Sequence, residues 1–169
     1  MSEKFRRHFM KEKDAKVFLE KAKKKLGAFL EHILKTKANI ELIQTEFAEI
    51  YLINGKPLMA EVAGNIFPTL AFKEFLLSAP KVFVDMGAIP HVCNGANVMA
   101  PGITRFEGEF RKGDFVIIAD EKHGKALSVG EVKYDAVEAK KITHGIIVEN
   151  IHFVGDRIWD FIKRFEAKY

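Results

Sequence analysis

The sequence predicts an α+β protein with a mixed helix-and-strand N-terminal domain, a small β-barrel with short helices, and a C-terminal helix. Three observations predict this order. Apolar residues recur at helical spacing over 14–35, alternate along the chain over 40–62, and gather from residue 81 onward in short runs separated by glycine-containing turns. The dipeptide Ala79-Pro80 breaks the chain between the two patterns. We therefore expect an N-terminal domain over 1–80 and a C-terminal domain over 81–169.

The first expected element is a helix that begins at an Asp14 cap and runs to about Lys35. Its apolar residues lie three or four positions apart and therefore share one face, as do Phe18, Ala22, Leu26, Phe29, Leu30 and Ile33. Gly27 weakens the middle of this helix by about 1 kcal/mol relative to alanine. Much of the remaining circumference carries a run of lysines, namely Lys21, Lys23, Lys24 and Lys25.

Strands follow over 40–43 and 50–62, where apolar and polar residues alternate. Asn54-Gly55 between two such runs is a strong signal for a tight hairpin turn. Residues 69–77 have a helical pattern that ends at Ala79-Pro80.

The second half begins with the apolar run 82–84, a compact helical segment, and a turn at 94–97 that leads into a strand closed by Pro101-Gly102. Further strands are expected over 113–120, 126–132 and 145–153, with a helical turn over 135–141. Asp156 begins a last helix that should pack on the protein through an apolar stripe of Ile158, Trp159, Ile162 and Phe165.

Composition limits the classes of function. The chain has 169 residues, 48% of them hydrophobic, so we expect a packed core. The single cysteine, Cys93, excludes a disulfide framework and a cysteine zinc site. No run of about 18 apolar residues and no signal peptide is present, so we expect a soluble, cytoplasmic protein that does not enter a membrane.

The net charge of +4 is unevenly distributed along the chain. The first 25 residues hold 10 basic and 4 acidic side chains, whereas residues 81–169 hold 13 of each. A basic N-terminal helix could steer the protein toward phosphates. The alternative is a solvated, solubilising face.

Signatures of catalysis are missing from the sequence. No phosphate-binding loop, nucleophile elbow or HExxH motif is present. Cys93 and His91 are two residues apart, which places them on different faces of a helical segment, so a buried structural cysteine is the better interpretation. We expect no enzymatic activity, no cofactor and no metal.

The segment KVFVDMGAIPHVCNGANVMAPGI at 81–103 resembles the PUA domain, a small RNA-binding β-barrel. The resemblance continues through GDFVIIAD at 113–120, ALSVGEV at 126–132 and GIIVENIHFVGDRIW at 145–159. The last segment is similar to translation-machinery-associated proteins of the malignant-T-cell-amplified-sequence and ligatin group, in which a pre-PUA domain precedes the PUA domain. The resemblance implies a pre-PUA/PUA architecture and, given the composition, an archaeal source.

The resemblance also implies the site. RNA lies against the first helix of a PUA domain, the loop after it and the following strand, and small residues there expose backbone groups to RNA. These positions match Asn94, Gly95, Ala96, Asn97, Val98, Met99, Pro101, Gly102 and Ile103. We add nearby basic side chains and a histidine as RNA-binding candidates: Lys81, Arg105, Lys122, Lys125 and His152. The alternatives are that the glycines only serve turns and that His152 is structural.

The function implied is non-catalytic binding of structured RNA, either tRNA (or its CCA end on the small ribosomal subunit) or rRNA. Lys21, Lys23, Lys24 and Lys25 would steer phosphates. An initiation-factor-like protein is a further expected partner. Two alternatives stay open: an accessory subunit that positions tRNA for an RNA-modification enzyme, and a protein–protein adaptor that acts through the N-terminal domain.

Overall fold

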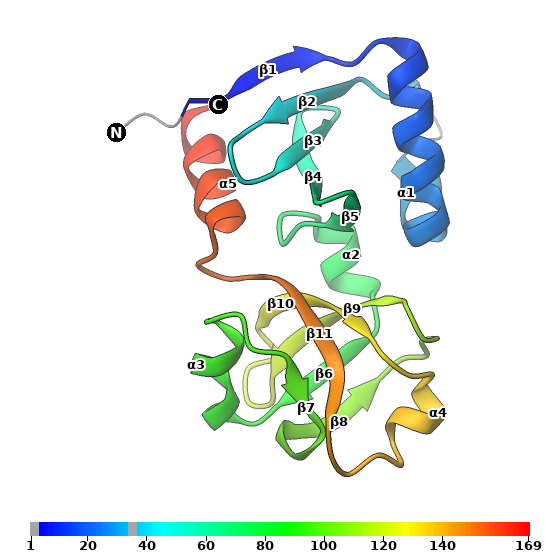
Figure 1. The fold of residues 1–169 in the computed structure, drawn as a ribbon, viewed down its shortest axis with the longest axis vertical. Coiled ribbons are helices and arrows are strands. Elements are labelled where there is room, and N and C mark those ends of the chain that lie inside the picture. The colour runs from blue at the N-terminus through cyan, green and yellow to red at the C-terminus, as the bar shows by residue number, and fades with distance from the viewer. Residues whose placement is uncertain (1–3, 34–36) are drawn as a thin grey trace. The chain divides into compact units, whose positions relative to one another are not determined.

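The computed structural model describes residues 4–33 and 37–169, which form two compact units, Met1–Phe75 and Leu76–Tyr169. The α+β fold class predicted from the sequence is confirmed: an antiparallel sheet with a helix is followed by a half-barrel with short helices and a C-terminal helix (Figure 1). Each unit has its own sheet.

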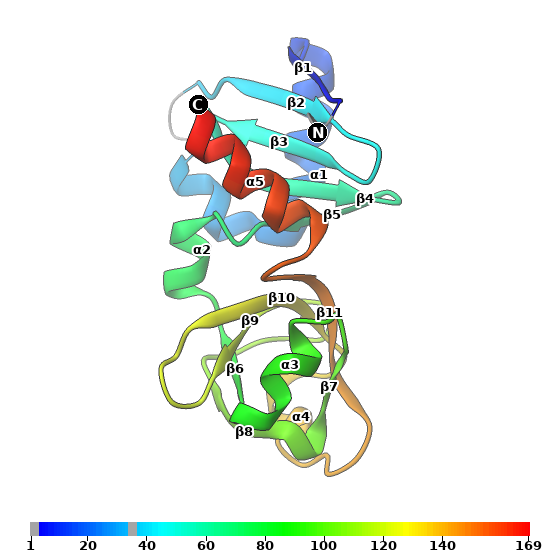
Figure 2. The ribbon, with the colours of Figure 1, turned by 90° about the vertical axis from the view of Figure 1, so that its left-hand side faces the viewer.

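The first unit is a five-stranded antiparallel sheet in chain order. Its strands are β1 (Arg6–Phe9), β2 (Ile40–Gln44), β3 (Glu49–Ile53), β4 (Lys56–Val62) and β5 (Asn65–Pro68). The helix α1 (Glu12–Ile33) lies along one face of this sheet (Figures 1 and 2). Phe18, which is buried with Ala22, Leu26 and Leu30, stacks on Tyr51 of β3 at a centroid distance of 3.9 Å. The predicted apolar face of the helix is therefore its buried face.

One local expectation for this helix is wrong, one agrees with the structure and one is not tested. The helix α1 begins at Glu12, so Asp14 lies within the first turn and is not the cap. The backbone at Leu26 leaves helical geometry (φ −129°, ψ 17°), beside the weak position Gly27. The expected helix end at Lys35 lies outside the described residues.

The turns of this unit show why its hairpins form. Asn54 and Gly55 have φ of 52° and 82°, as the predicted tight turn requires. Ala63 and Gly64 form a similar turn, with φ of 51° and 82°, between β4 and the unpredicted β5. The helix α2 (Lys73–Ser78) starts later than predicted, because the Thr69 hydroxyl donates to the Pro57 carbonyl oxygen and holds the preceding chain to β4.

The second unit is an open, six-stranded half-barrel. Its strands are β6 (Lys81–Val84), β7 (Val98–Met99), β8 (Ile103–Glu107), β9 (Phe115–Asp120), β10 (Ala126–Val132) and β11 (Ile146–Phe153), in the spatial order β7-β11-β10-β9-β6-β8. The pair β6–β9 is parallel and the other pairs are antiparallel. Within the described residues β7 and β8 are the two edges of the sheet, so the predicted barrel does not close.

Short helices complete this unit. They are η1 (Met86–Ala88), α3 (Ile89–Val92), η2 (Ala100–Gly102) and α4 (Ala136–Ala139). Figures 1 and 2 show α3 and α4 on opposite sides of the half-barrel. The core of this unit is mainly aliphatic, with Phe110 as its aromatic member, and includes Val82, Val84, Val98, Ile118, Ile147 and Val148.

The strand β11 contains a bulge where it pairs with β10. His152 pairs with Val129 and Asn150 pairs with Gly130, so Ile151 is the extra residue. A Cβ atom on Gly130 would lie 2.4 Å from Cγ1 of Val148 and 2.9 Å from the Glu149 carbonyl oxygen. Only glycine fits there, and the bulge redirects the side chains that follow it.

The last helix, α5 (Arg157–Lys168), begins at the predicted Asp156 cap, whose carboxylate accepts from the Trp159 N–H at 2.7 Å. Ile158, Phe161, Ile162 and Phe165 are its buried residues. Trp159 is only half-buried, so Phe161 takes the place that the predicted stripe gave to Trp159. The expectation of a covered apolar face is confirmed.

Candidate nucleic-acid interface

The predicted RNA loop, residues 94–97, follows α3 directly and completes its C-terminal end. The N–H groups of Asn94 and Ala96 donate to the His91 carbonyl oxygen, and the Gly95 N–H donates to that of Val92. Gly95 has φ of +91°, a conformation that L side chains rarely adopt. These three N–H groups are thus engaged within the protein.

Asn150 of β11 also holds the 94–97 loop in place through hydrogen bonds. Its Nδ2 atom donates to the carbonyl oxygens of Val92 and Ala96, at 2.9 and 3.0 Å. Its backbone N–H donates to Oδ1 of Asn97 at 2.9 Å. The sequence analysis did not select Asn150, although an asparagine within an apolar strand is a signal for such a role.

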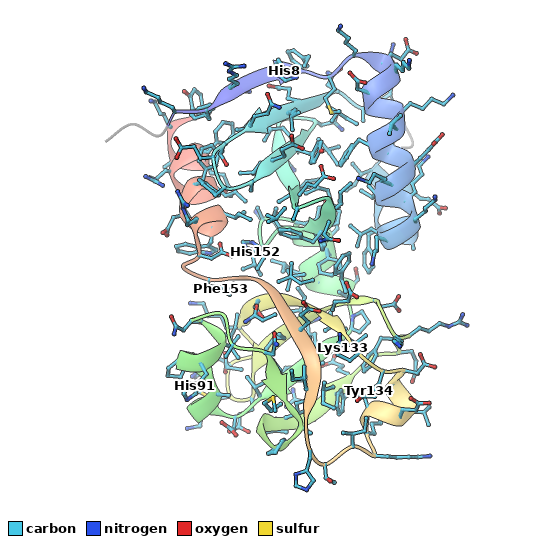
Figure 3. The ribbon with its side chains drawn as sticks, in the orientation of Figure 1. His8, His91, Lys133, Tyr134, His152 and Phe153 are labelled. Atoms are coloured by element: carbon cyan, nitrogen blue, oxygen red, sulfur yellow. The ribbon has the colours of Figure 1, made fainter. Side chains whose placement is uncertain are left out.

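The ring of Phe153 lies close to Gly95 of the same loop. A Cβ atom on Gly95 would lie 3.1 Å from Cε1 of the Phe153 ring. Glycine is therefore required at position 95 for two reasons, namely the positive φ and the close approach of the Phe153 ring. Figure 3 shows Phe153 and His152 at the end of β11 that leads to α5.

The predicted surface 94–103 divides into exposed and buried positions. Asn94, Ala96, Asn97, Met99 and Pro101 are exposed, whereas Gly95, Gly102 and Ile103 are half-buried. Val98 is 3% exposed and belongs to the core, so its side chain cannot contact RNA, which corrects that prediction. Met99, 46% exposed, pairs across the strands with Ile146, 40% exposed. The two residues form an apolar patch beside the loop.

Lys122 and Lys125 are exposed on the turn between β9 and β10. Asp120 organises this turn by accepting the N–H groups of Lys122, His123 and Lys125 at 3.0, 2.6 and 3.0 Å. These hydrogen bonds, that from His123 first, hold the pKa of Asp120 below its ordinary value. The turn is thus preformed, with its lysines facing solvent.

Two other basic residues that were predicted to bind RNA interact with groups of the protein itself. The Lys81 Nζ atom donates to the carbonyl oxygens of Leu77 and Ala79, near the end of α2. The guanidinium carbon of Arg105 lies 3.7 Å from the centre of the Phe83 ring, a cation–π contact. Lys81 is half-buried and Arg105 is exposed.

His152 has no exposed surface, so its predicted contact with RNA is wrong and the structural alternative holds. Its Nδ1 atom lies 2.8 Å from Oδ2 of Asp156. Burial by itself raises the pKa of Asp156, but the hydrogen bond and charge of His152, with the N–H groups of Trp159 and Phe153, bring it below the ordinary value. The pair fixes the start of α5.

Cys93 packs against the aliphatic core of the half-barrel. Burial raises the pKa of its thiol, and the nearby charge of Lys125 acts in the opposite direction. The thiol is therefore protonated and weakly nucleophilic near neutral pH. Its neighbour His91 is exposed on α3 (Figure 3).

The predicted phosphate-steering lysines of α1 are not equivalent. The Lys21 Nζ atom lies 3.0 Å from Oε1 of Glu61, and Oε2 of the same carboxylate accepts from the Tyr51 hydroxyl at 2.8 Å. Burial and this hydrogen bond raise the pKa of Tyr51. Lys23, Lys24 and Lys25 are exposed. Lys21 therefore joins α1 to β4 through this ion pair.

Within residues 4–33 and 37–169, no group of three or more histidine, cysteine or acidic side chains is arranged to hold a metal ion. In the same part of the chain, no helix has the length and apolar character needed to span a membrane.

Comparison with known proteins matches residues 80–154 to the PUA domain and residues 6–73 to a domain of unknown function, DUF1947. An uncharacterized protein of Methanocaldococcus jannaschii is 38% identical over 162 residues, which cover 92% of this chain and 96% of that protein. Translation machinery-associated protein 20 of Saccharomyces cerevisiae is 32% identical over 154 residues, or 86% of this chain and 85% of the yeast protein.

Among solved structures, a hypothetical protein of the hyperthermophilic archaeon Pyrococcus horikoshii is 30% identical, with a TM-score of 0.74. The alignment covers 93% of this chain and 99% of that one. The fold and these matches define a PUA-domain protein with an N-terminal DUF1947 domain. The chain belongs to the family that includes translation machinery-associated protein 20 and the malignant T-cell-amplified sequence proteins.

Proposed function

We propose that this protein is a non-catalytic RNA-binding component of the translation apparatus that grips structured RNA through the surface 94–103. One observation carries the proposal: Asn150 and Phe153 hold the 94–97 loop rigidly, while Asn94, Ala96, Asn97 and Met99 stay exposed. A loop fixed before binding loses little conformational entropy when it meets RNA. Exposed amides can hydrogen-bond sugar, phosphate or base edges, and Met99 with Ile146 offers an apolar contact for a base.

The surroundings of the loop support an anionic partner. Lys122 and Lys125 are exposed on a preformed turn. Charges on a rigid turn attract phosphates without a specific geometry. We therefore assign recognition to the loop and electrostatic attraction to the turn.

The names of related proteins support a role in translation. The yeast relative is named for its association with the translation machinery, and on that likeness we propose that this chain acts in the cytoplasm on the small ribosomal subunit. The RNA would be tRNA, gripped at its CCA end. Lys23, Lys24 and Lys25 of α1 would add contacts with phosphates, and an initiation-factor-like protein would dock on the N-terminal domain.

The test is the affinity of the purified protein for tRNA with and without its CCA end, together with co-sedimentation with small ribosomal subunits. We expect Met99→Glu to weaken binding to tRNA about tenfold, because it adds an anion to the proposed surface. Val62→Glu is the matched control, since Val62 is also an exposed apolar residue but lies on β4 in the first unit.

Equal affinities of the two variants would remove the 94–103 surface from the proposal. Stable copurification with an RNA-modification enzyme, without ribosomal subunits, would favour the accessory-subunit alternative. Binding of a protein partner with no affinity for RNA would favour the adaptor.

A further inference from the structure

The strand β1 forms one edge of the sheet of the first unit (Figure 1). It pairs with β2 on one side, and no strand within residues 4–33 and 37–169 pairs with its other side. All four of its residues, Arg6, Arg7, His8 and Phe9, are exposed. An uncovered strand edge is a template on which another extended chain can pair. The RNA contacts proposed above do not use this edge.

The register of β1 shows which of its backbone groups are directed outward. The Met10 N–H donates to the Ile40 carbonyl oxygen at 2.9 Å and so continues the pairing of β1 with β2. In an antiparallel pair, residues whose backbone groups face the partner strand alternate with residues whose groups face away. The backbone of His8 is therefore directed toward β2, whereas the N–H and C=O groups of Arg7 and Phe9 are directed to the outer side. These four groups can hydrogen-bond to an added strand.

An ion pair anchors the exposed strand β1 to β2. Nε of Arg7 donates to Oε2 of Glu41 at 2.6 Å, and Nη2 donates to Oε1 at 3.4 Å. Glu41 is only 8% exposed, so the pair lies in partly desolvated surroundings, where a charged hydrogen bond is strong. An edge that is already extended and anchored loses little conformational entropy when another strand pairs with it.

The side chains of β1 offer different chemistry on the two faces of the sheet. Successive side chains of a strand point to opposite faces, so Arg6 and His8 share one face, and Arg7 and Phe9 share the other. The first pair makes one face basic. On the other face the charge of Arg7 is balanced by Glu41, and the ring of Phe9 is 66% exposed. The edge therefore fits a strand with acidic side chains on one face and apolar side chains on the other.

The charge of the segment argues against two other occupants. Residues 4–13 hold five basic side chains and one acidic side chain, so a second copy of this strand would bring like charges together. RNA phosphates would meet the basic side chains, but phosphate oxygens only accept hydrogen bonds. They cannot satisfy the outward C=O groups of Arg7 and Phe9, whereas the backbone of a peptide both donates and accepts.

We propose that the outer edge of β1 binds an extended segment of a partner protein in which acidic and apolar residues alternate. The backbone of the segment pairs with Arg7 and Phe9, its carboxylates lie beside Arg6 and His8, and its apolar side chains pack on the Phe9 ring. The inference rests on the part of the proposed function that gives the N-terminal domain a protein partner, and it is independent of RNA binding.

The experiment measures the binding of fluorescein-labelled synthetic peptides to the full-length protein by fluorescence anisotropy. The probe is a peptide of about eight residues in which glutamate and valine alternate. Its control has the same composition, with all glutamates before all valines. We expect the alternating peptide to bind at least about tenfold more tightly, because only alternation places carboxylates and valines on opposite faces of a strand. Equal affinities of the two peptides would overturn the proposal.

N-methylation of the peptide tests whether it pairs through its backbone. Methyl groups on every second residue remove the N–H donors from one edge of the peptide strand only. One of the two possible sets should abolish binding, and the other should be tolerated. In NMR titrations the unmodified peptide should shift the amide signals of Arg7 and Phe9. Equal effects of the two methylated sets would overturn the proposal.

Variants of the protein locate the site. Arg6→Glu should weaken binding of the alternating peptide about tenfold, because it sets an anion against the carboxylates of the peptide. Lys56→Glu is the matched control, since it makes the same change of charge at an exposed residue at the start of β4. It should leave the affinity within about twofold. Thermal melting checks that both variants fold, and equal losses of affinity in the two would overturn the proposal.

The other occupants give distinct results. Neither peptide would bind if the edge serves a second copy of this chain, and sedimentation would show a dimer that Arg6→Glu alters. Shifts of the Arg7 and Phe9 amide signals with oligouridylate, but not with peptide, would assign the edge to RNA. Either result would overturn the proposal.

The failure of this proposal and that of the RNA function are distinguishable. Absence of peptide binding would leave RNA binding by the 94–103 surface intact. A protein that binds the alternating peptide but no tRNA would remove the RNA function and support the role of β1.

Discussion

The 94–97 loop and the lysine run of α1 are both candidates to meet RNA, but they are built differently. The loop is held by Asn150, by the Phe153 ring and by its own N–H groups. Lys23, Lys24 and Lys25 are exposed on a helix whose other face is buried. A fixed loop can discriminate among partners by shape, whereas exposed charges attract any polyanion. The difference predicts distinct responses to mutation.

The largest effect should come from Asn150→Asp, which keeps the size of the side chain. The change removes both donors to Val92 and Ala96 and sets a carboxylate against two carbonyl oxygens. We expect a loss of about 2–3 kcal/mol in unfolding free energy and more than tenfold in RNA affinity. Chemical denaturation and a binding titration measure the two losses. Asn94→Ala is the control, since Asn94 is exposed and should leave stability unchanged.

Next comes Gly95→Ala, which should cost about 1–3 kcal/mol, because alanine is strained at φ of +91° and its Cβ would press on Phe153. Gly95→Glu should lose as much stability and should weaken RNA binding further through repulsion of phosphate. Thermal melting separates the shared strain from the charge. Equal RNA affinities of the two variants would show that no phosphate approaches this position.

A smaller effect concerns Asp156, whose pKa is lowered in the folded state. Its contribution to stability is therefore complete above the ordinary aspartate pKa and is lost as pH falls through the lowered value. We expect the melting temperature to fall as the pH is lowered below about 4. The variant Asp156→Asn should be less stable at neutral pH, and its melting temperature should depend less on pH in the acid range. Asp160→Asn, an exposed change in the same helix, should keep the original profile.

Replacement of the exposed lysines of α1 should lower the affinity for RNA. Replacing Lys23, Lys24 and Lys25 with glutamine should weaken all RNAs alike and flatten the plot of log K against log salt by roughly 0.7–0.9 for each phosphate that is no longer neutralised. Lys21→Gln should behave differently and lower stability slightly, by up to about 1 kcal/mol, through its ion pair with Glu61. An unchanged slope in the triple variant would leave the lysines as a solubilising face.

The smallest effect is expected for Cys93→Ala. The half-buried thiol packs against the core, so its removal should cost about 1 kcal/mol at most and leave RNA binding unchanged. The raised pKa predicts slow alkylation of the thiol at neutral pH, measurable by mass spectrometry. An RNA-cleaving or RNA-modifying activity that disappears specifically in this variant would contradict the non-catalytic proposal.

Most of the fold could be predicted from the spacing of apolar residues and from turn residues in the sequence. The buried face of α1, the Asn54-Gly55 turn and the Asp156 cap follow from spacing and turn chemistry, which are local properties of the chain. The strands β1, β5 and β8 escaped prediction. All four residues of β1 are exposed, so no alternation marks it, and β5 has only four residues after an unexpected turn at Ala63-Gly64.

The site was predicted less completely, because its construction depends on distant residues. The segment 94–103 could be selected from its small residues and its resemblance to the PUA domain. The role of Asn150 could not, since it bonds to residues more than fifty positions earlier in the chain. Val98 and His152 were selected as contacts, but the half-barrel packing buries both.

The bulge in β11 has a consequence for how this chain can change during evolution. Within a few residues the strand carries the amide that holds the loop, the ring beneath Gly95 and the histidine at the start of α5. A strand directs successive side chains to opposite faces, so the gain or loss of one codon between Asn150 and Phe153 would misplace several of them at once. Substitutions can accumulate around this segment, whereas its length should be nearly invariant. Gly130, opposite the bulge, should resist replacement for the same reason.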